Sequence, residues 1–170
     1  ETFNLIKLWQ SKSEVPIIHS WQEDVGFRLA TSRNKAISKS TGDYIIMIDG
    51  DLILHQNFIK DHVKHSKKNQ FVIGPRVLLN ENYSIKLLRD KNISFSVPSR
   101  GILANKKNLI NNNFLSNLFS YQTKSDKQVR GCNMACFKSD LLSINGFNED
   151  FIGWGREDTE LVNRLLNLNV

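Results

Sequence analysis

The sequence has too few cysteines for a disulfide framework and no apolar run long enough for a membrane span. Its only cysteines are Cys132 and Cys136, with no second pair and no histidine nearby, so they do not predict a zinc site. We expect a reduced pair of thiols in a reducing compartment. No apolar run reaches the roughly 18 residues that a transmembrane helix requires. Signal-peptide features and internal repeats are also lacking.

An initiator methionine is missing as well. The chain opens on Glu1-Thr2-Phe3, inside a stretch with the pattern of an amphipathic helix, so we expect a piece of a longer protein. Its 170 residues are enough for one domain with a proper hydrophobic core. We therefore expect a single domain over residues 1–170 that is incomplete at its N-terminus and at its C-terminus.

The charge is positive but dispersed. The net charge of +6 suits anionic substrates, an acidic membrane surface or nucleic acid, and the basic residues cluster only at 64–68 and 106–107. Aromatic residues do not alternate with basic ones, as a base-stacking surface would require, so we expect no nucleic-acid partner. A peripheral contact with a membrane surface stays open.

One segment organises the rest of the chain. The apolar run Tyr44–Ile48 stops at Asp49-Gly50-Asp51, and such a run predicts a strand buried on both faces, as in the middle of an α/β sheet. Ligands of such sheets bind at the carboxyl ends of strands. The two-residue period of extended chain points Asp49 and Asp51 to one side, where two carboxylates suit Mn²⁺ or Mg²⁺ and a phosphate-bearing substrate. The simpler alternative is a polar turn that ends the strand.

The remaining pattern predicts alternating helices and strands, with short helices and loops over residues 78–127. Gly42 is the expected C-cap of the helix over 28–39, and the helix over 57–68 should turn Phe58, Ile59 and Val63 inward and leave its histidines exposed. The predicted helices are the end of one at 3–9, then 28–39, 57–68, 139–144 and 156–168; the predicted strands, besides 44–48, are 15–19, 71–74 and 129–137.

A second acidic site opens the last predicted helix. Glu157 and Asp158 are about 100° apart around the helix, and Asp158 lies at the margin of the apolar stripe, so it points inward. Acidic residues in a first turn can simply complement the helix dipole. However, Trp154 lies between Gly153 and Gly155, and an exposed indole beside carboxylates suits a sugar, whose C–H faces stack on the ring. Glu160 and Arg164 form an expected surface pair.

Four motifs in this order resemble the family-2 glycosyltransferases of the GT-A fold, and the resemblance implies an α/β fold with a central, mostly parallel sheet flanked by helices. They are Asp49-Gly50-Asp51, Gly131-Cys132-Asn133-Met134-Ala135, residues 146–151 and residues 153–161, and residues 22–28 and 33–37 also match. The Trp-Gly-x-Glu-Asp version resembles bacterial chondroitin polymerase domains and the β-1,4-galactosyltransferases. The family's first strand, with acidic residues that bind uracil and ribose, has no match here. A further metal ligand that follows the Glu-Asp helix in many members would lie beyond Val170.

The resemblance implies a role for each matched residue. Asp49 and Asp51 would hold a divalent cation, Mn²⁺ or Mg²⁺, on a nucleotide-sugar diphosphate, and Arg33 would help to bind the nucleotide. Asp158 would be the base that deprotonates the acceptor hydroxyl. Glu157 would help to hold the acceptor, and Trp154 would line the sugar subsites.

The expected function is therefore a metal-dependent inverting glycosyltransferase. The donor would be a UDP sugar, galactose or N-acetylgalactosamine, and the acceptor a glycan or glycolipid hydroxyl in surface polysaccharide or lipooligosaccharide synthesis, in the cytoplasm or at the inner face of the membrane. Two alternatives stay open. A nucleotidyltransferase also places paired aspartates at a strand end, and a non-catalytic sugar-binding module would need no base.

Overall fold

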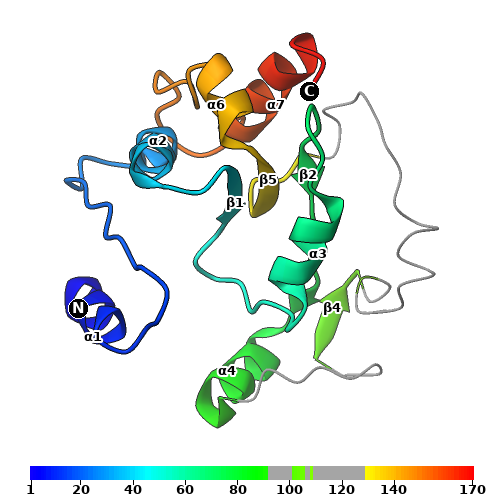
Figure 1. The fold of residues 1–170 in the computed structure, drawn as a ribbon. Coiled ribbons are helices and arrows are strands. Elements are labelled where there is room, and N and C mark those ends of the chain that lie inside the picture. Colours follow the sequence, from blue (N-terminus) through cyan, green and yellow to red (C-terminus); the bar gives the residue numbers. More distant parts are fainter. Residues whose placement is uncertain (92–100, 106–107, 109–128) are drawn as a thin grey trace.

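The computed structural model describes residues 1–91, 101–105, 108 and 129–170, and these form a mixed α/β structure (Figure 1). Most helices and strands lie where the sequence predicts them. The helices are α1 (Thr2–Gln10), α2 (Leu29–Lys39), α3 (Phe58–His65), α4 (Glu81–Asp90), α6 (Lys138–Ser143) and α7 (Glu157–Asn167); the strands are β1 (Tyr44–Ile48), β2 (Val72–Ile73), β3 (Leu78–Leu79), β4 (Ile102–Ala104) and β5 (Asn133–Phe137).

The sheet corrects the predicted fold class. The described strands form a three-stranded sheet in the order β1-β5-β2 and a two-stranded sheet of β3 and β4, and every pair is antiparallel. The expectation of a mostly parallel central sheet is therefore wrong for this part of the chain. The cause is β5, which enters between β1 and β2 in the opposite direction, so that those two strands point the same way without touching.

Burial also differs from the prediction for β1. Within the described residues β1 pairs on one edge only, and Met47 is its one buried side chain, while Ile48 is 43% exposed. The middle strand β5 takes the buried position instead, since its first four residues are all buried. An apolar run thus identified a strand correctly, but β5 is the strand that is covered on both faces.

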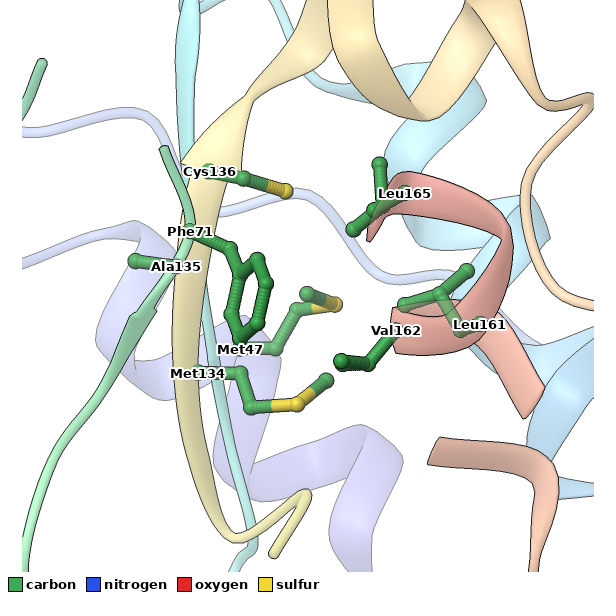
Figure 2. A pocket seen from close by; sticks show the side chains of 8 residues that line it. All are labelled: Met47, Phe71, Met134, Ala135, Cys136, Leu161, Val162 and Leu165. Atoms are coloured by element: carbon green, nitrogen blue, oxygen red, sulfur yellow. The ribbon is translucent and has the colours of Figure 1, made fainter. Parts of the chain in front are cut away.

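The main core lies between β1, β5 and α7. Figure 2 shows Met47, Met134 and Phe71 facing Leu161, Val162 and Leu165 across a small apolar pocket. The helical residues are 0–1% exposed. Their spacing of three and four residues matches the predicted stripe on α7, which is confirmed. Burial of this stripe fixes the start of α7 relative to the end of β1.

Helix α3 exposes two of its three predicted inward residues to solvent, and the third, Phe58, is half-buried. Ile59 and Val63 are 60% and 62% exposed, whereas His62, expected on the surface, is 5% exposed. The ring of His62 has a polar partner, since its Nε2 lies 2.8 Å from Asn133 Oδ1, and it meets the Phe58 ring edge-on. A buried polar group is stable where it is hydrogen-bonded, so this contact fixes the orientation of the helix.

Two local predictions need correction. Residues 15–19 form no strand, and α2 ends with Ser40 rather than Gly42 as its C-cap. In the stretch predicted to contain short helices and loops, α4 is such a helix, whereas the strands β3 and β4 were not predicted. Asn80 is the N-cap of α4, because its side chain accepts a hydrogen bond from the backbone N–H of Tyr83 at 2.8 Å. The rest of that stretch lies largely outside the described residues.

Helix α1 has no buried residue, and Figure 1 shows it apart from the three-stranded sheet. In the described part of the chain, no helix has the length and apolar character needed to cross a bilayer. Cys132 and Cys136 are free thiols, and both are buried.

Candidate active site

Two turns meet where β1 ends and β5 begins. Asp49, directly after β1, donates its backbone N–H to the carbonyl of Cys132 at 3.2 Å, just before β5. The antiparallel register continues this contact, since Ile48 lies opposite Asn133. The end of β1 is thereby fixed next to the turn at Gly131.

Arg33 joins the two predicted acidic motifs. Its Nη2 lies 3.0 Å from Asp49 Oδ1 and also donates to the Gly131 carbonyl at 3.2 Å, while its Nη1 forms an ion pair with Asp158 Oδ1. The Arg33 side chain is only 10% exposed, compared with 42% for Asp49 and 20% for Asp158. One guanidinium thus connects α2, the end of β1 and the start of α7.

The neighbour of Arg33 fastens α2 to a turn before α7. Asn34 exchanges two hydrogen bonds of 2.8 Å with the backbone of Phe147 and donates a third to Glu149 at 2.9 Å. Glu149 also accepts from Thr31 at 3.0 Å. The Arg33 guanidinium lies over the Phe147 ring, and its Cζ is 5.3 Å from the ring centroid, which is within range of a cation–π contact. These contacts orient Arg33 before any ligand binds.

The start of α7 is shaped by two left-handed residues. Gly155 has φ +102° and Arg156 has φ +72°, and the helix begins at Glu157 directly after them. Asp158 then lies against Gly131 so closely that an added Cβ at Gly131 would fall 1.9 Å from Asp158 Oδ2. Gly131 therefore has to lack a side chain for the two motifs to meet.

Glu157 differs sharply from Asp158. Its side chain is 5% exposed, and its buried Oε2 has no hydrogen-bond partner among the residues that the structure describes. Leaving a buried carboxyl oxygen without a partner costs roughly 1–3 kcal/mol or more. A ligand hydroxyl that donates to this oxygen would remove that cost.

The structure leaves two predicted site residues outside this cluster. Asp51 is exposed, two residues beyond Asp49, and Trp154 is 89% exposed. No hydrogen bond or ion pair of the described residues links either side chain to Arg33. Both side chains are therefore accessible to a ligand from solvent.

The residues at the end of β1 fit a divalent cation in a limited way. Asp49 and Asp51 supply hard oxygen ligands, but Gly50 and Asp51 form a turn and not the extended chain that the sequence predicts. No group of three potential ligands occurs among the described residues. A cation here would take its remaining ligands from phosphate oxygens and water, as Mg²⁺ commonly does.

Sequence reasoning named Arg33, Asp49 and Asp158 but gave no role to Gly131 or Asn34. Asn34 left a usable signal, because asparagine is a poor residue for a helix interior and is kept there when its side chain has a partner elsewhere. Gly131 gave no such signal beyond its place in a motif. Its role is to leave room for the Asp158 carboxylate, which is far away in the sequence.

Comparison with known proteins decides the family. A model described as "Glycosyl transferase family 2" matches residues 9–130, which is more than two thirds of the chain. The chain belongs to glycosyl transferase family 2. A second model, described as "N-terminal domain of galactosyltransferase", matches residues 114–170 and covers the Trp-Gly-x-Glu-Asp motif of this family-2 chain.

Two curated relatives agree with this membership. The family-2 chain is 22% identical over 175 residues to "Chondroitin synthase" of Pasteurella multocida (strain Pm70), covering 95% of this chain and 18% of that protein. It is 27% identical over 140 residues to "Putative glycosyltransferase EpsE" of Bacillus subtilis (strain 168), covering 81% of this chain and 49% of that protein. The chain thus spans less than half the length of either relative. Membership makes it a glycosyltransferase by class and implies the GT-A fold.

Proposed function

We propose that residues 1–170 belong to one catalytic domain of a metal-dependent inverting glycosyltransferase that transfers a sugar from a UDP sugar to a glycan hydroxyl. The observation that carries the proposal is the ion-pair cluster around Arg33. It brings the strand-end carboxylate Asp49 and the helix-tip carboxylate Asp158 onto one guanidinium. Asp49 would act on the diphosphate of the donor, and Asp158 would take a proton from the acceptor. Both can act on one reaction only if the two motifs lie next to each other.

The donor and pathway are finer parts of the proposal. We propose galactose or N-acetylgalactosamine as the donor sugar, supported by the match to a galactosyltransferase domain and by a relative named for chondroitin. The acceptor would be a glycan or glycolipid of a surface polysaccharide or lipooligosaccharide. We keep the cytoplasmic face of the membrane as the proposed place of reaction, because nucleotide sugars and a net charge of +6 both suit it.

In the proposed reaction the residues of the chain have separate tasks. Asp158 accepts the proton of the acceptor hydroxyl as that oxygen bonds to the anomeric carbon, and the bond from this carbon to the diphosphate breaks on the opposite side. Proton acceptance by a positioned carboxylate contributes a rate factor of about 10²–10⁴. Glu157 accepts a hydrogen bond from a sugar hydroxyl at its unpartnered oxygen, and Trp154 stacks on a sugar face.

Asp49 and Asp51 would hold Mn²⁺ or Mg²⁺ against the diphosphate. Such a cation offsets the negative charge that develops on the leaving UDP. The chain itself would supply two carboxylates, those of Asp49 and Asp51 after the end of β1. The absence of a covalent intermediate means that no further nucleophile is needed.

The proposal is tested by a donor screen on the full-length protein. UDP release is measured for each UDP sugar with Mn²⁺ and after removal of metal by a chelator. We expect UDP release with one of the donors, and no UDP release after the metal is removed.

Two variants test the roles of the carboxylates. Asp51→Ala should abolish Mn²⁺-dependent UDP binding in calorimetry, and Asp158→Asn should keep donor affinity but lose transfer. Asp90→Ala is the control, since Asp90 is a carboxylate outside the Arg33 cluster that pairs with its neighbour Arg89 at 2.8 Å.

Two results would end the proposal. Release of pyrophosphate instead of UDP would favour a nucleotidyltransferase, which likewise holds Mg²⁺ with paired aspartates. Sugar binding without turnover of any UDP sugar would favour a non-catalytic module, for which the exposed Trp154 is the supporting observation.

A further inference from the structure

The Arg33 guanidinium occupies the side of Asp49 that faces the centre of the cluster. It contacts Asp49 Oδ1 at 3.0 Å and holds Asp158 with its other terminal nitrogen. Its third contact, with the Gly131 carbonyl at 3.2 Å, fixes the plane of the guanidinium. Arginine stays charged at any physiological pH, so these contacts keep a permanent positive charge beside a proposed metal ligand.

That charge opposes a divalent cation at the same carboxylate. Two like charges a few Å apart repel, and this repulsion is weakly screened where the groups are shielded from water. Arg33 is shielded, since only 10% of its side chain is exposed. The same shielding makes the ion pairs of Arg33 with Asp49 and Asp158 costly to break. We therefore expect the Arg33 side chain to stay in place when a metal binds.

Geometry and charge therefore give Arg33 two separable effects. As a charge, it weakens metal binding at Asp49. As a planar group with two terminal nitrogens, it ties Asp158 to the end of β1, which a side chain with one nitrogen cannot do in the same way.

We infer that Arg33 is an internal counter-ion that competes with the divalent cation at Asp49 and, through its bond to Asp158, positions the base. The inference rests on the proposed function, because it presumes that Asp49 binds the metal and that Asp158 acts as the base. It adds a prediction that runs against intuition, since a substitution that damages transfer should improve metal binding. A role for Arg33 in nucleotide binding alone does not have this consequence.

The test compares Arg33→Gln with Arg33→Lys in the full-length protein. Gln has a polar end but no charge, whereas Lys has the charge but only one nitrogen. Mn²⁺ affinity is measured by calorimetry without any donor, and kcat and donor KM are measured separately. Arg164→Gln is the matched control, since Arg164 is also a partly buried arginine in an ion pair, with Glu160, outside the cluster.

We expect Arg33→Gln to bind Mn²⁺ on the order of tenfold more tightly than wild type, because one opposing charge is gone. Arg33→Lys should keep the wild-type Mn²⁺ affinity. Both should lower kcat by roughly 10²-fold or more, as expected when a general base is misplaced. Arg164→Gln should leave Mn²⁺ affinity and kcat close to wild type. Circular dichroism melting checks that each variant is folded.

Several outcomes overturn the inference. One is a folded Arg33→Gln variant with unchanged or weaker Mn²⁺ affinity, and another is either variant with normal kcat and only a raised donor KM. Failure of the proposed function looks different, since the full-length protein would then release pyrophosphate instead of UDP, or turn over no UDP sugar, whatever the Mn²⁺ affinities of the variants. If neither wild type nor Arg33→Gln binds Mn²⁺, the inference falls as well. Binding by Arg33→Gln but not by wild type would support the inference directly.

Discussion

At the scale of single residues, the candidate site depends on a glycine that leaves no room for a side chain. Gly131 lies against Asp158, and a methyl group at Gly131 would overlap the carboxylate, with 1.9 Å to Oδ2 and 2.2 Å to Cγ. The carboxylate is also tied to Arg33, so it cannot move away without losing that ion pair. The missing side chain at Gly131 is therefore a requirement of the site rather than of the turn.

We predict that Gly131→Ala lowers kcat by about 10²-fold or more, because it displaces the proposed base. The measurement is the initial rate of UDP release at saturating donor and acceptor. Gly42→Ala is the control, since its Cβ would meet only the Tyr44 carbonyl at an ordinary 3.8 Å. Equal rates for Gly131→Ala and wild type would show that Asp158 tolerates displacement and is not the base.

His62 gives a second prediction at this scale. Burial lowers the pKa of His62 from its ordinary 6.5, although the hydrogen bond to Asn133 and the charge of Asp61 act to raise it, and His65 adds to the lowering. Below about pH 6.5 the unfolded chain takes up a proton at this residue that the folded protein resists. The folded state should therefore lose stability as the pH falls from about 7 towards 5.

The check is urea unfolding at several pH values for wild type and His62→Gln. Gln can still donate to Asn133 Oδ1 but does not titrate, so the variant should show a shallower loss of stability with falling pH. The same slope in both proteins would mean that His62 is protonated as easily in the folded state as in the unfolded one.

At the scale of elements, α7 combines packing with function. Leu161, Val162 and Leu165 hold one side of α7 in the core, and the same helix begins with Glu157 and Asp158. Packing energy is therefore what places the acidic tip near Arg33. A loss of packing on α7 should reach the site even though no site residue is changed.

We predict that Leu161→Ala destabilises the protein by about 2–5 kcal/mol, as is usual for a fully buried leucine. Leu161 is 0% exposed, whereas Leu168, just after the same helix, is 50% exposed. Leu168→Ala should therefore change stability by no more than about 0.5 kcal/mol. Denaturant midpoints of the three proteins test this, and equal losses for both variants would contradict the packing of α7.

The same elements show how far sequence reasoning could go. Periodicity predicted the buried stripe of α7, because its apolar side is also its covered side. The same argument failed for α3, where Ile59 and Val63 are apolar but exposed, and His62 is buried by a partner 71 residues away. Local pattern gives the apolar side of a helix, and only long-range contacts decide which side is covered.

In the candidate site, too, local motifs predicted the single residues but not the long-range contacts between them. Motifs named Asp49 and Asp158, since carboxylates after a strand and at a helix start are typical of bound metals and bases. Their connection through Arg33 spans 16 residues on one side and 125 on the other, and no spacing rule reaches that far. The sheet direction failed for a related reason, because an apolar run predicts a strand but does not fix its neighbour.

At the scale of the whole molecule, stability is distributed unevenly along the chain. Strand β5 lies between β1 and β2, and its first four side chains are buried. In contrast, α1 has no buried residue, and large apolar side chains of the first 27 residues are exposed, among them Phe3, Trp9 and Trp21. Backbone amides exchange slowly where opening requires global unfolding and quickly where few contacts hold the segment.

We predict that hydrogen exchange of the isolated 170-residue chain is slowest over β5 and fastest over α1 among the described elements. The measurement is deuterium uptake of peptides that cover Thr2–Gln10 and Asn133–Phe137, at a pH where the protein stays folded. Exchange in β5 should approach the rate set by global unfolding, because all its neighbours must separate first. Protection of α1 as strong as that of β5 would mean that the helix is held by contacts that its exposed side chains do not reveal. Fast exchange in β5 would instead contradict the described sheet. Because this sheet supports Asp49, the geometry of the Arg33 cluster would then be wrong as well.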